Sequence, residues 1–151
     1  MPSLVSGGTF ENNWKNILDK LRNILRAEFK GALPVYIGEE GSEGSQFIRL
    51  DPVGSDLTDL SVTGEIREYT IDVFYYFAEH NVKKAALDHV LRYVSRIEAL
   101  IHDNLTMTLS DTNSSNAFNC RLETTELNPD EESGVYVVQW EYKCQHQGNI
   151  A

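Results

Sequence analysis

The sequence predicts an α+β fold in which two amphipathic helices pack on one face of a largely antiparallel sheet. Two segments, about 11–30 and 82–103, repeat their apolar residues every three or four positions, which is the spacing of one helical face. Several other segments are short and rich in aromatic and β-branched residues, and turn-forming residues separate them, as in strands joined by hairpins. The expected order is α-β-β-β-α-(β)-β-β, with both helices most simply laid on a single face of the sheet.

The first helix is delimited by its ends as well as by its stripe. Thr9, Asn12 or Asn13 can accept a hydrogen bond from a free backbone N–H group and so cap its start. Gly31 fits the position that ends many helices, and Pro34 prevents the helix from resuming because it lacks an N–H group. Its apolar stripe consists of Trp14, Ile17, Leu18, Leu21, Ile24, Leu25 and Phe29.

The segment between the two helices is expected to form three strands. Strands 35–37 and 47–50 are joined by the Gly- and Glu-rich hairpin loop 38–45, and a second loop, 52–63, follows them. Segment 66–78 is the strongest predicted strand, because it is dense in aromatic and β-branched residues. One of its faces presents Tyr69, Ile71, Val73, Tyr75 and Phe77, and the other presents Glu68, Thr70, Asp72, Phe74, Tyr76 and Ala78.

The second half of the chain begins with the long helix 82–103 and continues with a short strand at 106–109. Strands 118–127 and 135–146 then form a hairpin around the segment 128–134, whose composition is typical of a turn. The apolar stripe of the helix consists of Leu87, Val90, Leu91, Val94, Ile97 and Ile101. The apolar face of the last strand consists of Tyr136, Val138, Trp140, Tyr142 and Cys144.

Charge predicts the register of this final hairpin. Pairing Cys120 directly with Cys144 would place Arg121 opposite Lys143, and like charges directly opposite each other are destabilising. A slip of two residues places Arg121 opposite Glu141 instead. We therefore expect the slipped register, with the two thiols diagonal to each other and no disulfide between them.

The length of 151 residues favours one domain with a core of its own. We expect a flexible arm at 1–10, a single α+β domain at 11–146 and a short tail at 147–151. There is no apolar run that could cross a bilayer and no signal-peptide pattern, so the sequence predicts a soluble protein that folds in a cytoplasm. The net charge of −10 argues against a general nucleic-acid binder. An acidic wall would nevertheless suit a passage through which DNA slides.

Motifs that carry chemistry are missing from the sequence. His80, His89, His102 and His146 form no pair with metal-ligand spacing, and neither cysteine has a partner nearby. We expect His89 and His102 to be solvated residues of the second helix. The loop 38–45 has no lysine to hold a phosphate, and no serine lies in a nucleophile-elbow pattern. The sequence therefore indicates no cofactor, no metal and no enzymatic activity.

Apolar surface is in excess of what two helices can cover. The two helices can cover one face of the sheet. Large apolar residues also fall on the other face, namely Phe74, Tyr76, Val135 and Val137. A solvated sheet face normally alternates to polar residues, and soluble monomers rarely expose a large contiguous apolar patch. Three explanations are open: the chain's own loop 52–65 covers the patch, another subunit packs on it, or it lines a ligand pocket.

The order of the elements and their residue patterns resemble those of one known protein family. A helix with a Trp-x-x-Ile-Leu start at Trp14, a long Arg-x-Tyr-x-Ile-x-Val strand from Arg67, and a final hairpin with a Trp-x-Tyr strand at Trp140 are similar to the tail-terminator (tail-completion, head–tail joining) proteins of tailed bacteriophages. The resemblance covers about residues 10–146. It implies a virion protein of the phage neck, assembled in the host cytoplasm, that acts by assembly and not by catalysis.

The resemblance also implies partners. Members of this family form a homo-oligomeric ring, commonly of about six copies, that caps the tail tube and meets the head connector while DNA passes through its centre. The apolar patch would then be a subunit interface. Two alternatives stay open: another virion part of related fold, such as a connector or tail-tube subunit, and a small-ligand-binding or enzymatic α+β domain. Acidic loop residues become candidates for the channel or for contacts between rings: Glu39, Glu40, Glu43, Asp130, Glu131 and Glu132.

Overall fold

The structure is a computed structural model with two helices and six strands, which confirms the predicted α+β class and element order. It describes residues 12–30, 32–38, 46–61, 64–78, 83–109, 115–130 and 135–148. The elements are α1 (Asn13–Phe29), β1 (Val35–Ile37), β2 (Gln46–Ser61), β3 (Gly64–Ala78), α2 (Lys83–His102), β4 (Met107–Thr108), β5 (Asn116–Asp130) and β6 (Val135–Gly148). The predicted flexible arm 1–10 lies outside the described residues, and β6 continues two residues past the predicted domain end at 146.

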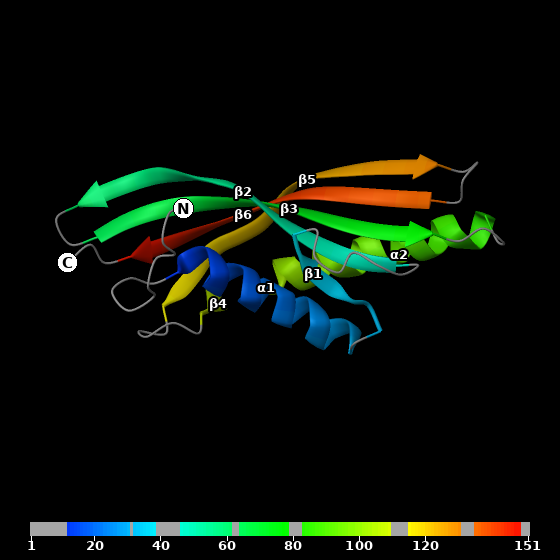
Figure 1. The fold of residues 1–151 in the computed structure, drawn as a ribbon, viewed down its shortest axis with the longest axis horizontal. Helices are drawn as coiled ribbons and strands as arrows, with labels where there is room; N and C mark the ends of the chain where they lie inside the picture. Colours follow the sequence, from blue (N-terminus) through cyan, green and yellow to red (C-terminus); the bar gives the residue numbers. More distant parts are fainter. Residues whose placement is uncertain are drawn as a thin grey trace, which may run out of the picture.

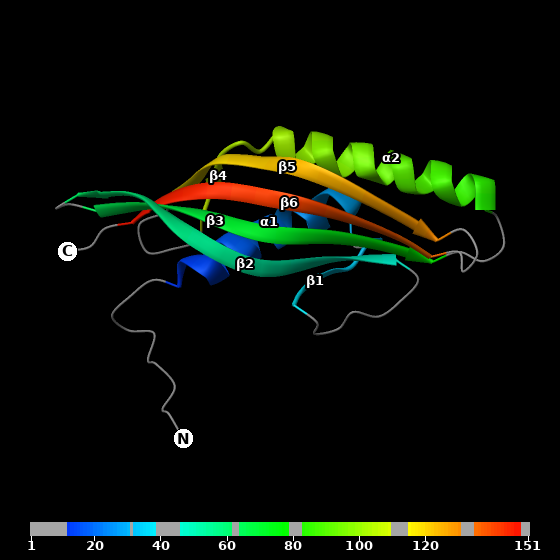
Figure 2. The same ribbon diagram turned by 90° about the horizontal axis from the view of Figure 1, so that it is seen from above.

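Both helices lie on one face of the sheet, as predicted, and among the described residues no helix covers the opposite face (Figures 1 and 2). The strand order is β1-β2-β3-β6-β5-β4. Asn12 caps α1 by accepting a hydrogen bond from the backbone N–H of Lys15. The core between helices and sheet is fully buried at Ile17, Leu21, Leu25, Ile97 and Ile101 of the helices and at Ile71, Val73, Tyr75, Trp140 and Tyr142 of the sheet.

The predicted hairpin of 35–37 with 47–50 is wrong, because β1 and β2 pair in parallel. Val35 lies opposite Ile48, and both side chains are buried. The Ile48 N–H donates to the Pro34 carbonyl, and the Gly38 N–H donates to the Leu50 carbonyl. β1 is only three residues long, about 10 Å at the rise of a strand, so a parallel neighbour needs only a short return of the chain before β2 begins. All other pairs in the sheet are antiparallel.

The predicted loop 52–63 is also wrong, because β2 continues through Pro52 to Ser61 and pairs with β3 along its whole length. Two register shifts, between Pro52 and Gly54 and between Leu57 and Asp59, interrupt the ladder. Such bulges accommodate an unpaired residue in a continuous strand, which is why turn-forming residues here do not end it. The far end of this hairpin extends beyond α1 as an arm (Figure 1).

The predicted register of the last hairpin is wrong as well. Arg121 lies opposite Lys143, with register shifts on both sides of this pair. The two cations are compensated by two carboxylates, one on β5 itself and one on β3, which a comparison of the two hairpin strands leaves out. Arg121 Nη2 lies 3.1 Å from Glu68 Oε2 on β3, and Lys143 Nζ lies 3.4 Å from Glu123 Oε2. Cys120 and Cys144 are buried free thiols.

Candidate assembly surface

The face of the sheet without helices carries a cluster of aromatic side chains, which we call the open-face patch. Its members are supplied by four neighbouring strands and share a face because they lie opposite one another in the ladder. Phe47 lies opposite Tyr76, Tyr76 lies opposite Val137, and Arg49 lies opposite both Tyr36 and Phe74. The patch consists of Tyr36, Phe47, Phe74, Tyr76 and Val137.

Ring contacts hold the patch in a fixed shape. The rings of Phe47 and Tyr76 stack with their centroids 4.9 Å apart, and Tyr36 lies 5.9 Å from Phe47. The guanidinium carbon of Arg49 lies 4.7 Å from the centroid of the Phe74 ring, in the geometry of a cation–π interaction. Apart from Phe47, which its neighbours bury, the side chains are half-buried. The patch is therefore a pre-organised apolar surface and not a set of loose side chains.

Three of the four residues predicted for this surface lie together. Phe74, Tyr76 and Val137 are members of the patch, whereas Val135 lies at its end, opposite Ala78 and half-buried. Sequence reasoning missed Tyr36 and Phe47. The alternation of Phe47 and Arg49 with the buried Ile48 and Leu50 was a usable signal for Phe47, but Tyr36 joins the patch only through the parallel pairing.

An acidic row borders the patch. Asp51, Asp72 and Glu141 lie side by side on β2, β3 and β6. Burial raises the pKa of Asp72 above its ordinary value, against the lowering effect of a hydrogen bond from Gln139, and the neighbouring Glu141 and Asp51 carboxylates raise it further. The Arg49 guanidinium pairs with Asp51 at 3.0 Å. This row disfavours anionic partners at the edge of the patch.

One of the three explanations for the surplus apolar surface loses its support. The loop proposed as a cover is part of the sheet between Pro52 and Ser61. The groove found among the described residues lies at the α2 end of the sheet, and neither Phe74 nor Tyr76 lines it. Within the described residues there is also no group of three or more metal-ligating side chains. Packing of another subunit on the patch remains a prediction.

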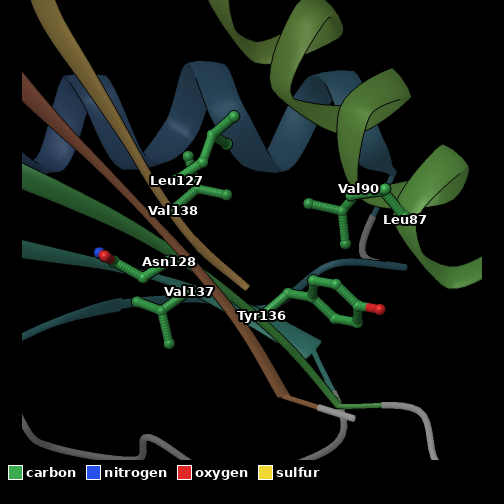
Figure 3. A pocket seen from close by; sticks show the side chains of 7 residues that line it. All are labelled: Leu87, Val90, Leu127, Asn128, Tyr136, Val137 and Val138. Carbon is green, nitrogen blue, oxygen red and sulfur yellow. The ribbon is translucent and has the colours of Figure 1, made fainter. Parts of the chain in front are cut away.

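The apolar groove lies between the start of α2 and the ends of β5 and β6 (Figure 3). It encloses about 260 Å³ of empty space, part of it open to solvent. Leu87 on α2 is 36% exposed and Leu127 on β5 is 49% exposed, so the predicted helix stripe is not wholly buried. The groove has no charged lining residue among those described: it is lined by Leu87, Val90, Leu127, Asn128, Tyr136, Val137 and Val138.

Most of the acidic residues predicted to line a channel lie outside the residues that the structure describes. Glu39, Glu40, Glu43, Glu131 and Glu132 lie outside the described residues. Asp130 is the last residue of β5, opposite Val135. Their role in a channel or between rings therefore stays a prediction.

His89, which the sequence predicts to be solvated, is instead packed at the edge of the core. The His89 ring lies 4.4 Å from the Tyr93 ring and 4.7 Å from the Phe77 ring, and its Nε2 lies 3.4 Å from Gln46 Oε1. The helix stripe did not predict this because two of the three contacts come from β2 and β3. His102, by contrast, is exposed as expected. His146 is buried and its Nε2 lies 2.8 Å from the Ser115 hydroxyl oxygen.

The packing of His89 predicts a loss of stability in mild acid. Burial, aided by the nearby Arg92 charge and opposed by Asp88, lowers the pKa of His89 below its ordinary 6.5. The unfolded chain therefore binds the proton more tightly, so this contribution is complete above about pH 6.5 and is lost as the pH falls toward the folded-state pKa. Chemical denaturation between pH 7.5 and about 5 should show a steeper loss for the wild type than for His89→Gln.

The exposed His102 on the same helix supplies the matched control. His102→Gln should follow the wild-type curve, because the His102 side chain is exposed and its replacement leaves the packing of His89 intact. Parallel curves for the wild type and His89→Gln would contradict the burial of His89.

Comparison with known proteins finds likeness in structure only. No protein-family model matches the chain, and no curated protein matches its sequence. One similar solved structure is a chain of the virion of a native gene transfer agent particle, at 12% identity and a TM-score of 0.54, covering 92% of this chain and 100% of that one. A second, known only by a sequence identifier, has 12% identity and a TM-score of 0.59, covering 90% of this chain and 93% of its own.

At this identity the two structures establish a shared fold and nothing finer. Each match extends over nearly all of both chains that it compares. Among the described residues, no helix is both long and apolar enough to span a membrane.

Proposed function

We propose that the chain is a structural subunit of a tailed-phage-type virion, and within it the subunit that terminates the tail tube. About six copies would form a ring that joins the tube to the head connector, with DNA passing through the centre. The assignment rests on one combination: a helix-free sheet face with a pre-organised aromatic patch, in a chain whose fold matches the whole of a chain from a virion particle.

The open-face patch supports an assembly role because its composition suits burial against protein. Aromatic side chains with a neighbouring arginine are enriched at the centres of protein interfaces. Here Phe47, Phe74 and Tyr76 are already held by stacking and by Arg49, so little side-chain freedom is lost when a partner covers them. The bordering acidic row would set the orientation of that partner.

The distribution of charge supports a passage for DNA more than a binding site. The four long strands β2, β3, β5 and β6 contain ten acidic and four basic residues, a net charge of −6. Tight binding of DNA needs clustered basic side chains that neutralise phosphates. An acidic surface repels the duplex and lets it slide, which is what a subunit around a DNA channel requires.

Deletion of the gene from the particle-forming genome tests this function. We expect filled heads and tails to accumulate separately, with tubes of irregular length, because nothing would cap the tube or join it to the connector. Expression of the wild-type chain in trans should restore joined particles. Normal yields of joined particles without the chain would contradict a junction role, and a complete loss of tubes would indicate a tube subunit instead.

A further inference from the structure

The β2–β3 hairpin carries apolar side chains that no described helix covers. At one end of the sheet this hairpin extends past α1, and we call residues 53–61 and 64–69 the hairpin arm (Figures 1 and 2). On it, Leu57 is 46% exposed and Leu60 is 59% exposed. Burial of these two side chains would remove apolar surface from water, which is favourable.

Both leucines lie on the side of the sheet that the helices occupy. Tyr69 lies on that side, and Arg67 and Glu65 share its face because they stand two and four residues before it in the strand. Leu57 lies opposite Arg67, and Leu60 lies opposite Glu65. Arg67 Nε lies 3.2 Å from Glu65 Oε1, so the two charges on this face of the hairpin arm cancel. The face therefore suits an apolar occupant without charges of its own.

Helix α1 begins at the base of this face. The ring of Trp14 packs edge-to-face on that of Tyr69, with the centroids 4.8 Å apart, and Asn12 caps the helix just before Trp14. From there α1 runs away from the tip of the hairpin arm (Figures 1 and 2). The chain therefore enters α1 from the side to which the hairpin arm projects. Residues 1–11, which lie outside the described residues, join the helix at that place.

Residues 1–11 have the composition that this face requires. Their apolar side chains include those of Leu4, Val5 and Phe10, and Glu11 is the one charged residue in the segment. A segment of this kind buries apolar surface on the leucines at little cost in desolvated charge.

The length of the segment fits as well. Leu57 lies opposite the residue that stands two positions before Tyr69, about 7 Å along the strand. Phe10 stands two positions before Asn12 and spans the same distance in an extended chain. The whole segment of eleven residues extends to about 36 Å, which is enough to pass Leu60.

Two other segments outside the described residues adjoin this end of the sheet, and they fit less well. Residues 110–114 link β4 to β5 and are all polar. Residues 149–151 follow β6 and number only three. Of the three segments, 1–11 alone combines apolar side chains with the length to cover both leucines.

We propose that residues 1–11 fold back along the hairpin arm of their own chain and cover its leucines, with Phe10 on Leu57. A segment tethered at the base of the surface has a high effective concentration there, which favours the chain's own segment over that of a second copy. The contact lies within one chain, so it does not depend on the proposed ring. It withdraws the hairpin arm from association and leaves the open-face patch as the apolar surface that a free subunit presents.

A photoreactive side chain at position 10 tests the contact. In the full chain, p-benzoylphenylalanine in place of Phe10 should cross-link on irradiation to the tryptic peptide 50–67, and the product should have the mass of one chain. Leu57→Ser with Leu60→Ser should lose this product. Leu127→Ser, at a leucine of similar exposure near the other end of the sheet, is the matched control and should keep it.

Binding of the neutral dye Nile red reads the same contact without a foreign side chain. Phe10→Ser should raise the fluorescence of the dye above that of the wild type, because the leucines become uncovered. Adding Leu57→Ser and Leu60→Ser should return the fluorescence to the wild-type level. Thr9→Ser, a change beside Phe10 that removes no large apolar group, should leave it unchanged.

Three results would overturn the docking of residues 1–11 on their own hairpin arm. They are cross-links that reach only other peptides, cross-links that join two chains, and equal dye fluorescence for the wild type and Phe10→Ser. In each case the proposed ring stands, since it does not use this contact. The Leu57 and Leu60 variants should keep the wild-type circular dichroism spectrum because both side chains are exposed.

Discussion

Trp140→Ala is expected to lower the free energy of unfolding by about 3–5 kcal/mol. Trp140 is fully buried at the middle of β6, between Val73 on β3 and Thr125 on β5. Its removal leaves a large cavity where the sheet meets the helices. Since domains of this size are stable by only about 5–15 kcal/mol, this loss is a large share of the total, and urea denaturation followed by circular dichroism should show a clearly lower midpoint.

Two further variants check the cause of this loss. The indole Nε1 of Trp140 is buried without a hydrogen-bond partner among the described residues, so Trp140→Phe removes an unpaired donor and should cost less than about 1.5 kcal/mol. Trp14→Ala is the matched control, because Trp14 is only half-buried, with its ring edge-to-face with Tyr69 at 4.8 Å. A larger loss for Trp14→Ala than for Trp140→Ala would contradict the described core.

Tyr76→Glu is expected to abolish ring formation while the chain stays folded, with association weakened at least about a hundredfold, or about 3 kcal/mol. Tyr76 lies between Phe47 and Val137 on the helix-free face. A carboxylate at this place would have to be desolvated beside apolar neighbours when a subunit packs on the patch. Native mass spectrometry should show a monomer where the wild type gives a ring.

A charge of the same sign on the helix side serves as control for this variant. Asn23→Glu lies on the exposed side of α1, away from the patch, and should assemble like the wild type. Phe74→Ala, which shortens the patch without adding charge, should show an intermediate loss. If Tyr76→Glu forms rings as readily as Asn23→Glu, the open-face patch is not a subunit interface.

Elements with an uninterrupted apolar period could be predicted from the sequence, and those shaped by long-range pairing could not. The stripes of α1 and α2 and the alternation of β3 and β6 identify these elements because burial imposes a period of 3.6 or 2 on each of them. Pro52 and Gly54 indicate a turn, yet β3 supplies a partner strand and two bulges absorb the irregularity. The register at Arg121 was not predicted, because Glu68 on a third strand offsets the repulsion between Arg121 and Lys143.

Some residues of the candidate surface could likewise be predicted from the sequence, and others depend on long-range pairing. Phe74 and Tyr76 could be found because they are large apolar residues on the polar-side positions of a strongly alternating strand. Phe47 could have been found from the alternation along β2, whereas Tyr36 joins the patch only through the parallel pairing of β1 with β2. The groove at Leu87 could not be predicted, since the helical period does not tell where α2 leaves the sheet and its stripe becomes exposed.

The copy number and position of the chain in purified particles test the tail-terminator role most directly. Quantitative mass spectrometry of the particles, with gold-labelled antibody and electron microscopy, measures both. A terminator ring predicts about six copies per particle, all at the junction of head and tail. Label spread along the tube in far larger numbers, or particles that lack the chain altogether, would contradict it.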